Sequence, residues 1–198
     1  WRLAGVIVFG AFASQLDTSI VNVGLDTTGR DLGASLGKVQ WVSNGYLLAL
    51  AVALPLTAWL GRRLGVGRLW LGSLAAFTAA SGLCALAQTM PQLVAFRVLQ
   101  GSGAGGLVPI ALSTVGGLVP PRDRGRYQGL IGATFAAAAL AGPPLGGVIA
   151  DNTSWRWIFI VNLPLGVIAL CAIAVAMPRE VTRREHSIDD LLLQHQHS

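Results

Sequence analysis

Charge is scarce in this sequence. Of its 198 residues, 12% are charged, 53% are hydrophobic, and the mean hydropathy is +0.61. A water-soluble domain carries about a quarter charged residues, so the composition excludes one. The charged residues are bunched, and most of the uncharged runs between them reach the roughly 20 residues with which a helix crosses about 30 Å of hydrocarbon. The sequence therefore predicts an all-α membrane protein.

Cysteine and histidine are also scarce. Cys84 and Cys171 fall inside separate apolar runs, so no disulfide framework is predicted. All three histidines follow Pro178, and the sequence has no HExxH motif, so we predict no metal and no cofactor. An intramembrane serine protease would need a base beside a nucleophile such as Ser102, but no apolar run contains a histidine. We therefore predict that the chain is not an enzyme.

Six membrane spans are predicted, at residues 3–25, 40–60, 69–87, 92–118, 128–150 and 157–177, followed by a polar tail at 179–198. A turn is expected at 88–92, where polar residues and a proline separate two apolar stretches. Ten arginines lie on one side of the predicted spans, and Arg30, Lys38 and Arg156 lie on the other. Because basic residues favour the cytoplasmic side, we expect both termini and the tail to be cytoplasmic.

Asp17 is the most informative residue, because an ionisable group inside a span costs roughly 2.5 to 3.5 kcal/mol and usually faces a partner or a cavity. Arg97 is the one other charge well inside a predicted span. At 1.5 Å per residue, Asp17 lies about 12 Å and Arg97 about 9 Å below the outer surface. The two side chains can therefore pair, either as a proton-coupling site or as an ion pair that only fixes helix packing.

Small residues cluster in the fourth and fifth spans. Gly101 with Gly105 and Gly142 with Gly146 have the GxxxG spacing that lets helices approach closely in a bilayer. Pro143 and Pro144 remove two backbone donors from the fifth span, which fits either a gate or a structural kink. Three tyrosine and tryptophan residues, Trp41, Tyr46 and Trp59, are expected at lipid interfaces rather than in a cavity.

Four motifs resemble the major facilitator superfamily, and within it the drug:proton antiporters with fourteen predicted spans. They are residues 16–23 around Asp17 and Asn22, the segment 93–103 with Arg97, Gln100, Gly101 and Gly103, the segment 142–147 with Gly142, Pro143, Gly146 and Gly147, and the stretch from Trp155 through Asn162 to Gly166. This resemblance implies the N-terminal six-span half of a major facilitator fold. It also implies proton coupling by Asp17 and Arg97. The residues implied to line a substrate cavity or to pack helices are Asn22, Gln100, Gly101, Gly103, Gly142, Pro143, Gly146 and Gly147.

A fifth motif, the cytoplasmic gate loop between the second and third spans, matches less well. Arg63, Gly65 and Arg68 fit it, but Arg62 stands where the family usually has an aspartate and Ala58 replaces its first glycine. In the family that aspartate holds the cytoplasmic gate, so its reversal to arginine changes the charge at this point.

The resemblance implies proton-coupled export of drugs or other amphipathic organic compounds. The excess of arginine over lysine, thirteen to one, suggests a bacterial source and therefore a bacterial plasma membrane. Alternating access needs two six-span halves, and this chain contains one. We therefore expect a partial or truncated transporter that works with a second six-span half or with a copy of itself. The alternative is a non-transporting remnant or membrane binding module. The expected partners are the lipid bilayer, protons and a small organic substrate, with no nucleic acid.

Overall fold

The computed structural model describes residues 2–118 and 120–176, and within these ranges it is helical with no strands. Seven helices follow one another in the described ranges: α1 (Arg2–Asp31), α2 (Leu36–Leu64), α3 (Val66–Leu86), α4 (Met90–Leu118), α5 (Arg124–Asn152), α6 (Arg156–Ile160) and α7 (Asn162–Ala176). The first five predicted spans overlap α1 to α5, and the sixth, predicted at 157–177, overlaps α6 and α7 as far as Ala176. The segment predicted as a polar tail, 179–198, lies outside the described residues.

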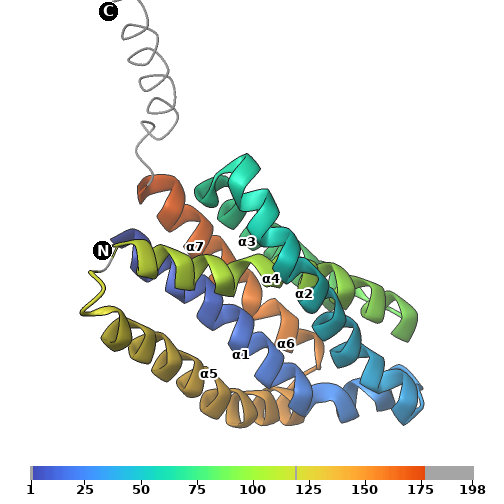
Figure 1. The fold of residues 1–198 in the computed structure, drawn as a ribbon. Coiled ribbons are helices and arrows are strands. Elements are labelled where there is room, and N and C mark those ends of the chain that lie inside the picture. Colours follow the sequence, from blue (N-terminus) through green and yellow to red (C-terminus); the bar gives the residue numbers. More distant parts are fainter. Residues whose placement is uncertain (1, 119, 177–198) are drawn as a thin grey trace, which may run out of the picture.

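The helices form one elongated bundle (Figure 1). α4 packs against α2 and α3, while α5 packs chiefly against α1. The start of α1, the connection from α4 to α5 and the end of α7 lie at the same end of the bundle. This is the up-and-down arrangement that short connections between long helices impose.

Two glycines make the short connections between helices. Gly33 follows α1 with a φ of 58°, and Gly65 alone separates α2 from α3 with a φ of 79°. Side chains with a Cβ rarely adopt this left-handed region, so glycine is the residue that can end a helix there.

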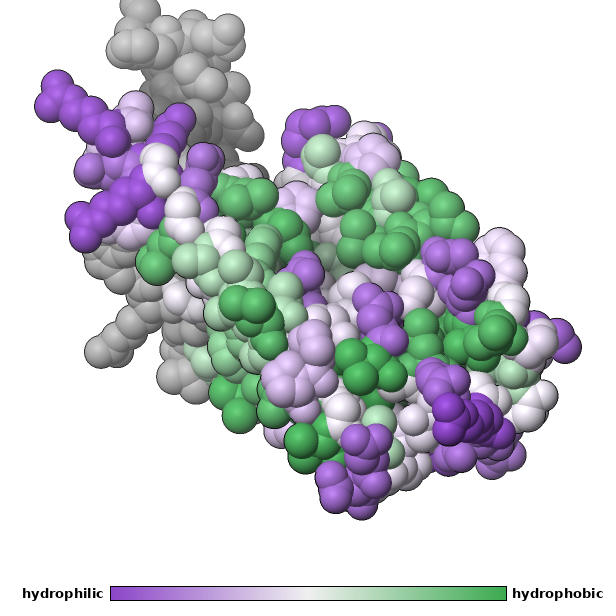
Figure 2. All heavy atoms as spheres, turned by 90° about the horizontal axis from the view of Figure 1, so that it is seen from below, coloured by the Kyte–Doolittle hydropathy of each residue, from purple (hydrophilic) through white to green (hydrophobic). Residues whose placement is uncertain are grey.

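Four described helices are long and apolar enough to cross a membrane: α2, α3, α5 and the part of α4 from Met90 to Thr114. On the face shown in Figure 2, hydrophilic side chains gather toward the two ends and hydrophobic ones cover much of the surface between them. Large apolar residues such as Leu48, Val52 and Leu140 are exposed, as expected where the surroundings are lipid. The positions at which the membrane surfaces cross each helix stay a prediction.

The sixth helical segment differs from the single span predicted at 157–177. It is broken at Val161, between the short helix α6 and the longer α7. Pro164 explains the break, because its ring clashes with the carbonyl of the residue four positions earlier, which is Ile160, the last residue of α6. Asn162 thereby becomes the first residue of α7.

Glycines set the distance between α1 and α5, as the GxxxG spacing predicts for close packing. A Cβ on Gly142 would collide with Ser19, and one on Gly146 would lie 2.9 Å from the backbone oxygen of Ile20. Gly147, the next residue, has nothing within 4 Å of its Cβ position. Pro143 and Pro144 lie inside α5 with exposed side chains, and the helix continues through them.

We predict that Gly146→Ala destabilises the bundle while Gly147→Ala does not. The methyl group at position 146 forces α5 away from Ile20, which costs about 1–3 kcal/mol. At position 147 the same change meets open space and gains up to about 1 kcal/mol in helix propensity. Thermal unfolding in detergent measures both. Equal midpoints for the two variants would contradict the close contact.

Candidate proton-coupling site

The core is divided into two large apolar clusters with a polar layer between them. One cluster contains Leu16, Ile20, Cys84 and Leu93, and the other contains residues such as Ala11, Phe77 and Ala104. Between these positions on α1, α3 and α4 stand buried polar residues: Ser14, Asp17, Ser81, Arg97 and Gln100. Ordinary packing does not require a polar layer in an apolar bundle, so this layer is the candidate site.

An ion pair lies at the centre of the layer. Nη1 of Arg97 in α4 is 2.6 Å from Oδ2 of Asp17 in α1, and the two side chains are 1% and 0% exposed. The depth argument from the sequence predicts this pairing, and the structure confirms it. Burying either charge alone would be strongly unfavourable, so each charge offsets part of the cost of burying the other.

Gln100 completes the contact one helical turn after Arg97. Its Oε1 accepts from Nη1 of Arg97 at 2.6 Å, and its Nε2 donates to Oδ1 of Asp17 at 3.1 Å and to Oγ of Ser81 at 2.6 Å. Ser81 in turn donates to the carbonyl oxygen of Phe77 at 3.0 Å. Both ends of the Gln100 amide are therefore committed, which fixes its orientation.

Arg97 has further partners on α2 and α6. Its Nε donates to the carbonyl oxygen of Val42 at 3.3 Å, and its guanidinium lies 4.1 Å from the ring centre of Tyr46 and 5.8 Å from that of Phe159. Aromatic faces attract a guanidinium, more strongly where water is excluded. The hydroxyl of Tyr46 lies 3.3 Å from Oγ of Ser14.

Asn162 brings α7 to the same carboxylate. Its Nδ2 donates to Oδ1 of Asp17, and its side chain is 1% exposed. Oδ1 therefore receives two amide donors while Oδ2 receives the guanidinium. Six helices, α1 to α4, α6 and α7, contribute a group to this network.

The remaining residues singled out from the sequence lie away from the ion pair. Asn22 is exposed and accepts from the Ser43 hydroxyl at 2.9 Å. Gly101 faces the backbone of Tyr46, and Gly103 faces that of Phe77, so both allow close helix approach. The gate-loop arginines, Arg62, Arg63 and Arg68, are exposed beside Gly65. Arg63 stacks over Trp59 at 4.5 Å.

Sequence reasoning misplaced one residue of the site and did not identify three others. Tyr46 was expected at a lipid interface, but it is 1% exposed and covers Arg97, because α2 turns this face toward α4. Trp41 and Trp59 are exposed. Ser14, Ser81 and Asn162 were not identified as site residues. Ser14 lies three residues before Asp17, so helical spacing was a usable signal for it.

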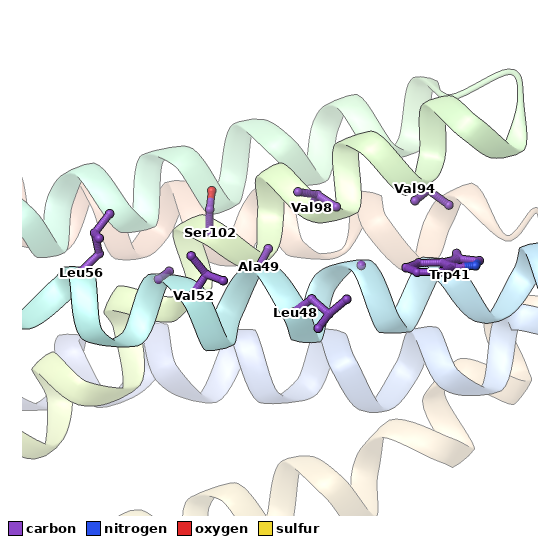
Figure 3. Close-up of a pocket in the computed structure, with 10 residues that line it drawn as sticks. Trp41, Leu48, Ala49, Val52, Leu56, Val94, Val98 and Ser102 are labelled. Carbon is purple, nitrogen blue, oxygen red and sulfur yellow. The ribbon is translucent and has the colours of Figure 1, made fainter.

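A groove runs between α2 and α4 (Figure 3), and Arg97 is not among the residues that line it. Its volume is about 530 Å³. The lining is almost wholly apolar and includes Trp41, Leu48, Val52, Val94, Val98 and Ser102. The Ser102 hydroxyl donates to the carbonyl oxygen of Leu99 at 2.6 Å.

We predict that neutralising one partner of the buried ion pair destabilises the protein more than neutralising both. Asp17→Asn leaves Arg97 buried without its counter-charge, which costs about 3–5 kcal/mol. Adding Arg97→Gln removes the stranded charge, so the double variant unfolds at a higher temperature than Asp17→Asn alone. The exposed pair Asp26–Arg30 is the control, and Asp26→Asn there costs about 0–1 kcal/mol. Additive losses at positions 17 and 97 would contradict the coupling.

Comparison with known proteins agrees with this architecture. Residues 7–190 match the family model described as Major Facilitator Superfamily. The chain is 37% identical over 188 residues to the "Multidrug resistance protein B homolog" of Mycobacterium tuberculosis, covering 95% of this chain and 35% of that protein. It is 39% identical over 183 residues to the "Putative multidrug resistance protein MdtD" of Salmonella typhi, covering 90% and 38%.

A third relative is the "Multidrug export protein EmrB" of Haemophilus influenzae, 40% identical over 156 residues, covering 79% of this chain and 31% of that protein. The chain thus spans about a third of the length of these relatives. Among solved structures, the D-xylose-proton symporter matches with a TM-score of 0.75 and 14% identity, over 99% of this chain and 52% of that one.

The comparisons confirm the predicted fold class. The described bundle matches about half of a major facilitator structure, and its apolar helices identify a multi-pass protein embedded in lipid. The family match covers almost the whole chain and is independent of the likeness to the solved structure. The chain belongs to the Major Facilitator Superfamily, a family of transporters rather than enzymes.

Proposed function

We propose that this chain is part of a proton-coupled exporter of drugs or other amphipathic organic compounds. One observation carries the proposal: a carboxylate, Asp17, is fully buried in an apolar bundle and paired with Arg97. Intramembrane carboxylates with a basic partner are the groups that transporters use to bind and release protons. The names of the relatives, which refer to multidrug resistance and multidrug export, support an organic substrate.

Protonation changes the contact between α1 and α4. In the ionised state Asp17 accepts charge-assisted hydrogen bonds from Arg97 and amide bonds from Gln100 and Asn162. A neutral carboxyl group holds Arg97 less strongly, because protonation removes the attraction between two opposite charges in a water-excluded site. Loading a proton therefore loosens the α1–α4 contact, and releasing it tightens that contact.

The substrate and the proton occupy separate places in the described conformation. Asp17 has no exposed surface, so an organic compound cannot touch it without movement of the helices. The groove between α2 and α4 is the alternative contact for the apolar part of a substrate, since drug-sized ligands fill pockets of about 300–1,000 Å³. Val94 and Val98, on either side of Arg97 in sequence, line that groove. A substrate in the groove therefore presses on the helix that carries Arg97.

The orientation in the proposed bacterial inner membrane follows from the arginines. We place both termini and the α2–α3 connection, with Arg62, Arg63 and Arg68, in the cytoplasm, and Lys38 outside. This connection is the proposed cytoplasmic gate loop. Arg62 replaces the acidic residue that the family usually has there, so the loop offers three positive side chains and no carboxylate.

Transport tests the coupling directly. Protein in liposomes is expected to move protons when a cationic dye is added, and Asp17→Asn is expected to abolish this movement because the buried carboxylate is gone. Asp26→Asn, which removes an exposed carboxylate on the same helix, is the control. The measurement is a pH-sensitive dye inside the vesicles. If wild type and Asp17→Asn behave alike, coupling by Asp17 is wrong, and a protein that binds dye without moving it is a binding module.

Thiol labelling tests the orientation. In a Cys171→Ala background, Lys38→Cys is expected to react with a membrane-impermeant maleimide in intact cells, because Lys38 is exposed at the proposed outer end. Arg68→Cys, exposed at the opposite end, is expected to react only after permeabilisation. Cys84 is buried and stays as the internal negative control. The reverse pattern would invert the proposed topology.

A further inference from the structure

Asn162 differs from Gln100, the other amide of the polar network, because only one end of its side-chain amide makes a hydrogen bond. Its Nδ2 donates to Oδ1 of Asp17, whereas its Oδ1 is a buried atom with no hydrogen-bond partner among the described residues. A buried acceptor without a partner costs about 1–3 kcal/mol, so it calls for an explanation. The side chain is 1% exposed, which leaves the neighbouring protein groups to supply that partner.

Gln100 provides the contrast, since it donates to the same carboxylate oxygen. Turning over the Gln100 amide would break its bonds to Arg97, Asp17 and Ser81 together. Turning over the Asn162 amide would break a single recorded bond, the one to Asp17. The two ends of an amide are nearly equal in size, so this rotation needs no repacking.

A protonated Asp17 carries an O–H donor, which needs a hydrogen-bond acceptor. An ionised Asp17 has no donor and needs none. Arg97 has donors only, and Gln100 presents its nitrogen to the carboxylate. The acceptor beside Oδ1 that has no other bond is the Asn162 carbonyl.

We propose that Asn162 is a positioning residue that reads the protonation state of Asp17 by turning over its amide. With Asp17 ionised, Asn162 Nδ2 donates to Oδ1; with Asp17 protonated on Oδ1, the carboxyl O–H donates to Oδ1 of Asn162. This inference rests on the proposed function, because it assumes that Asp17 takes up a proton.

The proton balance is simple. A hydronium ion transfers its proton to Oδ1 of Asp17, so one O–H bond breaks in the hydronium, one forms on the carboxylate, and a water molecule leaves. The charge of the site rises by one. Arg97 keeps its own proton, and its contact with Oδ2 weakens as the carboxylate loses its charge. The other titratable groups facing the site are Tyr46 on α2 and Cys84 on α3, which reach Ser14 and Gln100 respectively. α6 and α7 bring Phe159 and Asn162, and α5 meets α1 through Gly142 and Gly146 near Ser19 and Ile20.

The same movement ties α7 to the proton. Asn162 is the first residue of α7, directly after the break that Pro164 imposes. Because the amide can serve either state of Asp17, α7 stays bonded to α1 while the α1–α4 contact weakens. Protonation of Asp17 therefore weakens the contact of α1 with α4 and leaves the contact of α1 with α7 in place.

Infrared difference spectroscopy of the wild-type protein in liposomes tests the proposal without any variant at position 162. Asparagine is isotope-labelled at its side-chain carbonyl, and spectra are recorded as the pH is lowered. When the carboxyl band of Asp17 appears, the labelled carbonyl band is expected to shift to lower frequency, because its oxygen now accepts a hydrogen bond. Asp17→Asn removes the carboxyl band and is expected to remove the shift.

Two variants assign and extend the signal. Asn162→Leu is expected to lose the shifted band, whereas Asn22→Leu, the same change at an exposed asparagine away from Asp17, keeps it. Asn162→Ser, whose hydroxyl both donates and accepts, is expected to retain more proton-coupled dye movement than Asn162→Leu. If Asn162 only filled space, serine would be no better a replacement than leucine, because serine is smaller and fills the site less well.

The outcomes separate this proposal from the proposed function. If the Asp17 carboxyl band appears and the labelled carbonyl does not shift, proton uptake stands and the Asn162 proposal is overturned. If no Asp17 band appears at any pH at which the protein is folded, both fall.

Discussion

The buried ion pair between Asp17 and Arg97 is the constraint on which the rest of the bundle depends. Each charge costs several kcal/mol to remove from water, and the attraction between them offsets this only when further hydrogen bonds satisfy the remaining atoms. Those bonds come from Gln100 on α4, Val42 on α2 and Asn162 on α7, and Ser81 on α3 holds Gln100 in place. Meeting the needs of one ion pair therefore fixes the mutual positions of most helices.

The glycines of α4 belong to the same constraint. A Cβ on Gly101 would collide with the backbone of Tyr46, and one on Gly103 would lie 2.7 Å from the backbone nitrogen of Phe77. Because Gly101 and Gly103 have no Cβ atom, α2 and α3 approach α4 closely. This approach brings the centre of the Tyr46 ring to 4.1 Å from the Arg97 guanidinium. Close packing and the polar site are thus two consequences of one set of small residues, although the sequence presents them as separate motifs.

The depth of a residue along its helix could be predicted from the sequence. The neighbouring helix that its side chain faces could not. The pairing of Asp17 with Arg97 follows from a rise of 1.5 Å per residue and two charges at similar depth. The burial of Tyr46 depends on which face α2 turns toward α4, and an all-round apolar helix carries little pattern to indicate it. The same ambiguity hid Ser81 and Asn162. The break at Val161 had a readable cause in Pro164, but an apolar run of spanning length concealed it.

Packing and proton coupling are therefore compatible readings of the same bonds. A structural ion pair needs only to be satisfied, and Gln100 together with the guanidinium would nearly achieve that for Asp17. A coupling site must also remain satisfied after its charge changes, which requires a group that can exchange donor for acceptor. Asn162, with one bond made and one buried oxygen unpartnered, has the chemistry for that exchange. Because Asp17 is sealed from solvent, a substrate of the proposed exporter would act on it through the helices, and α4 joins the apolar groove to the ion pair.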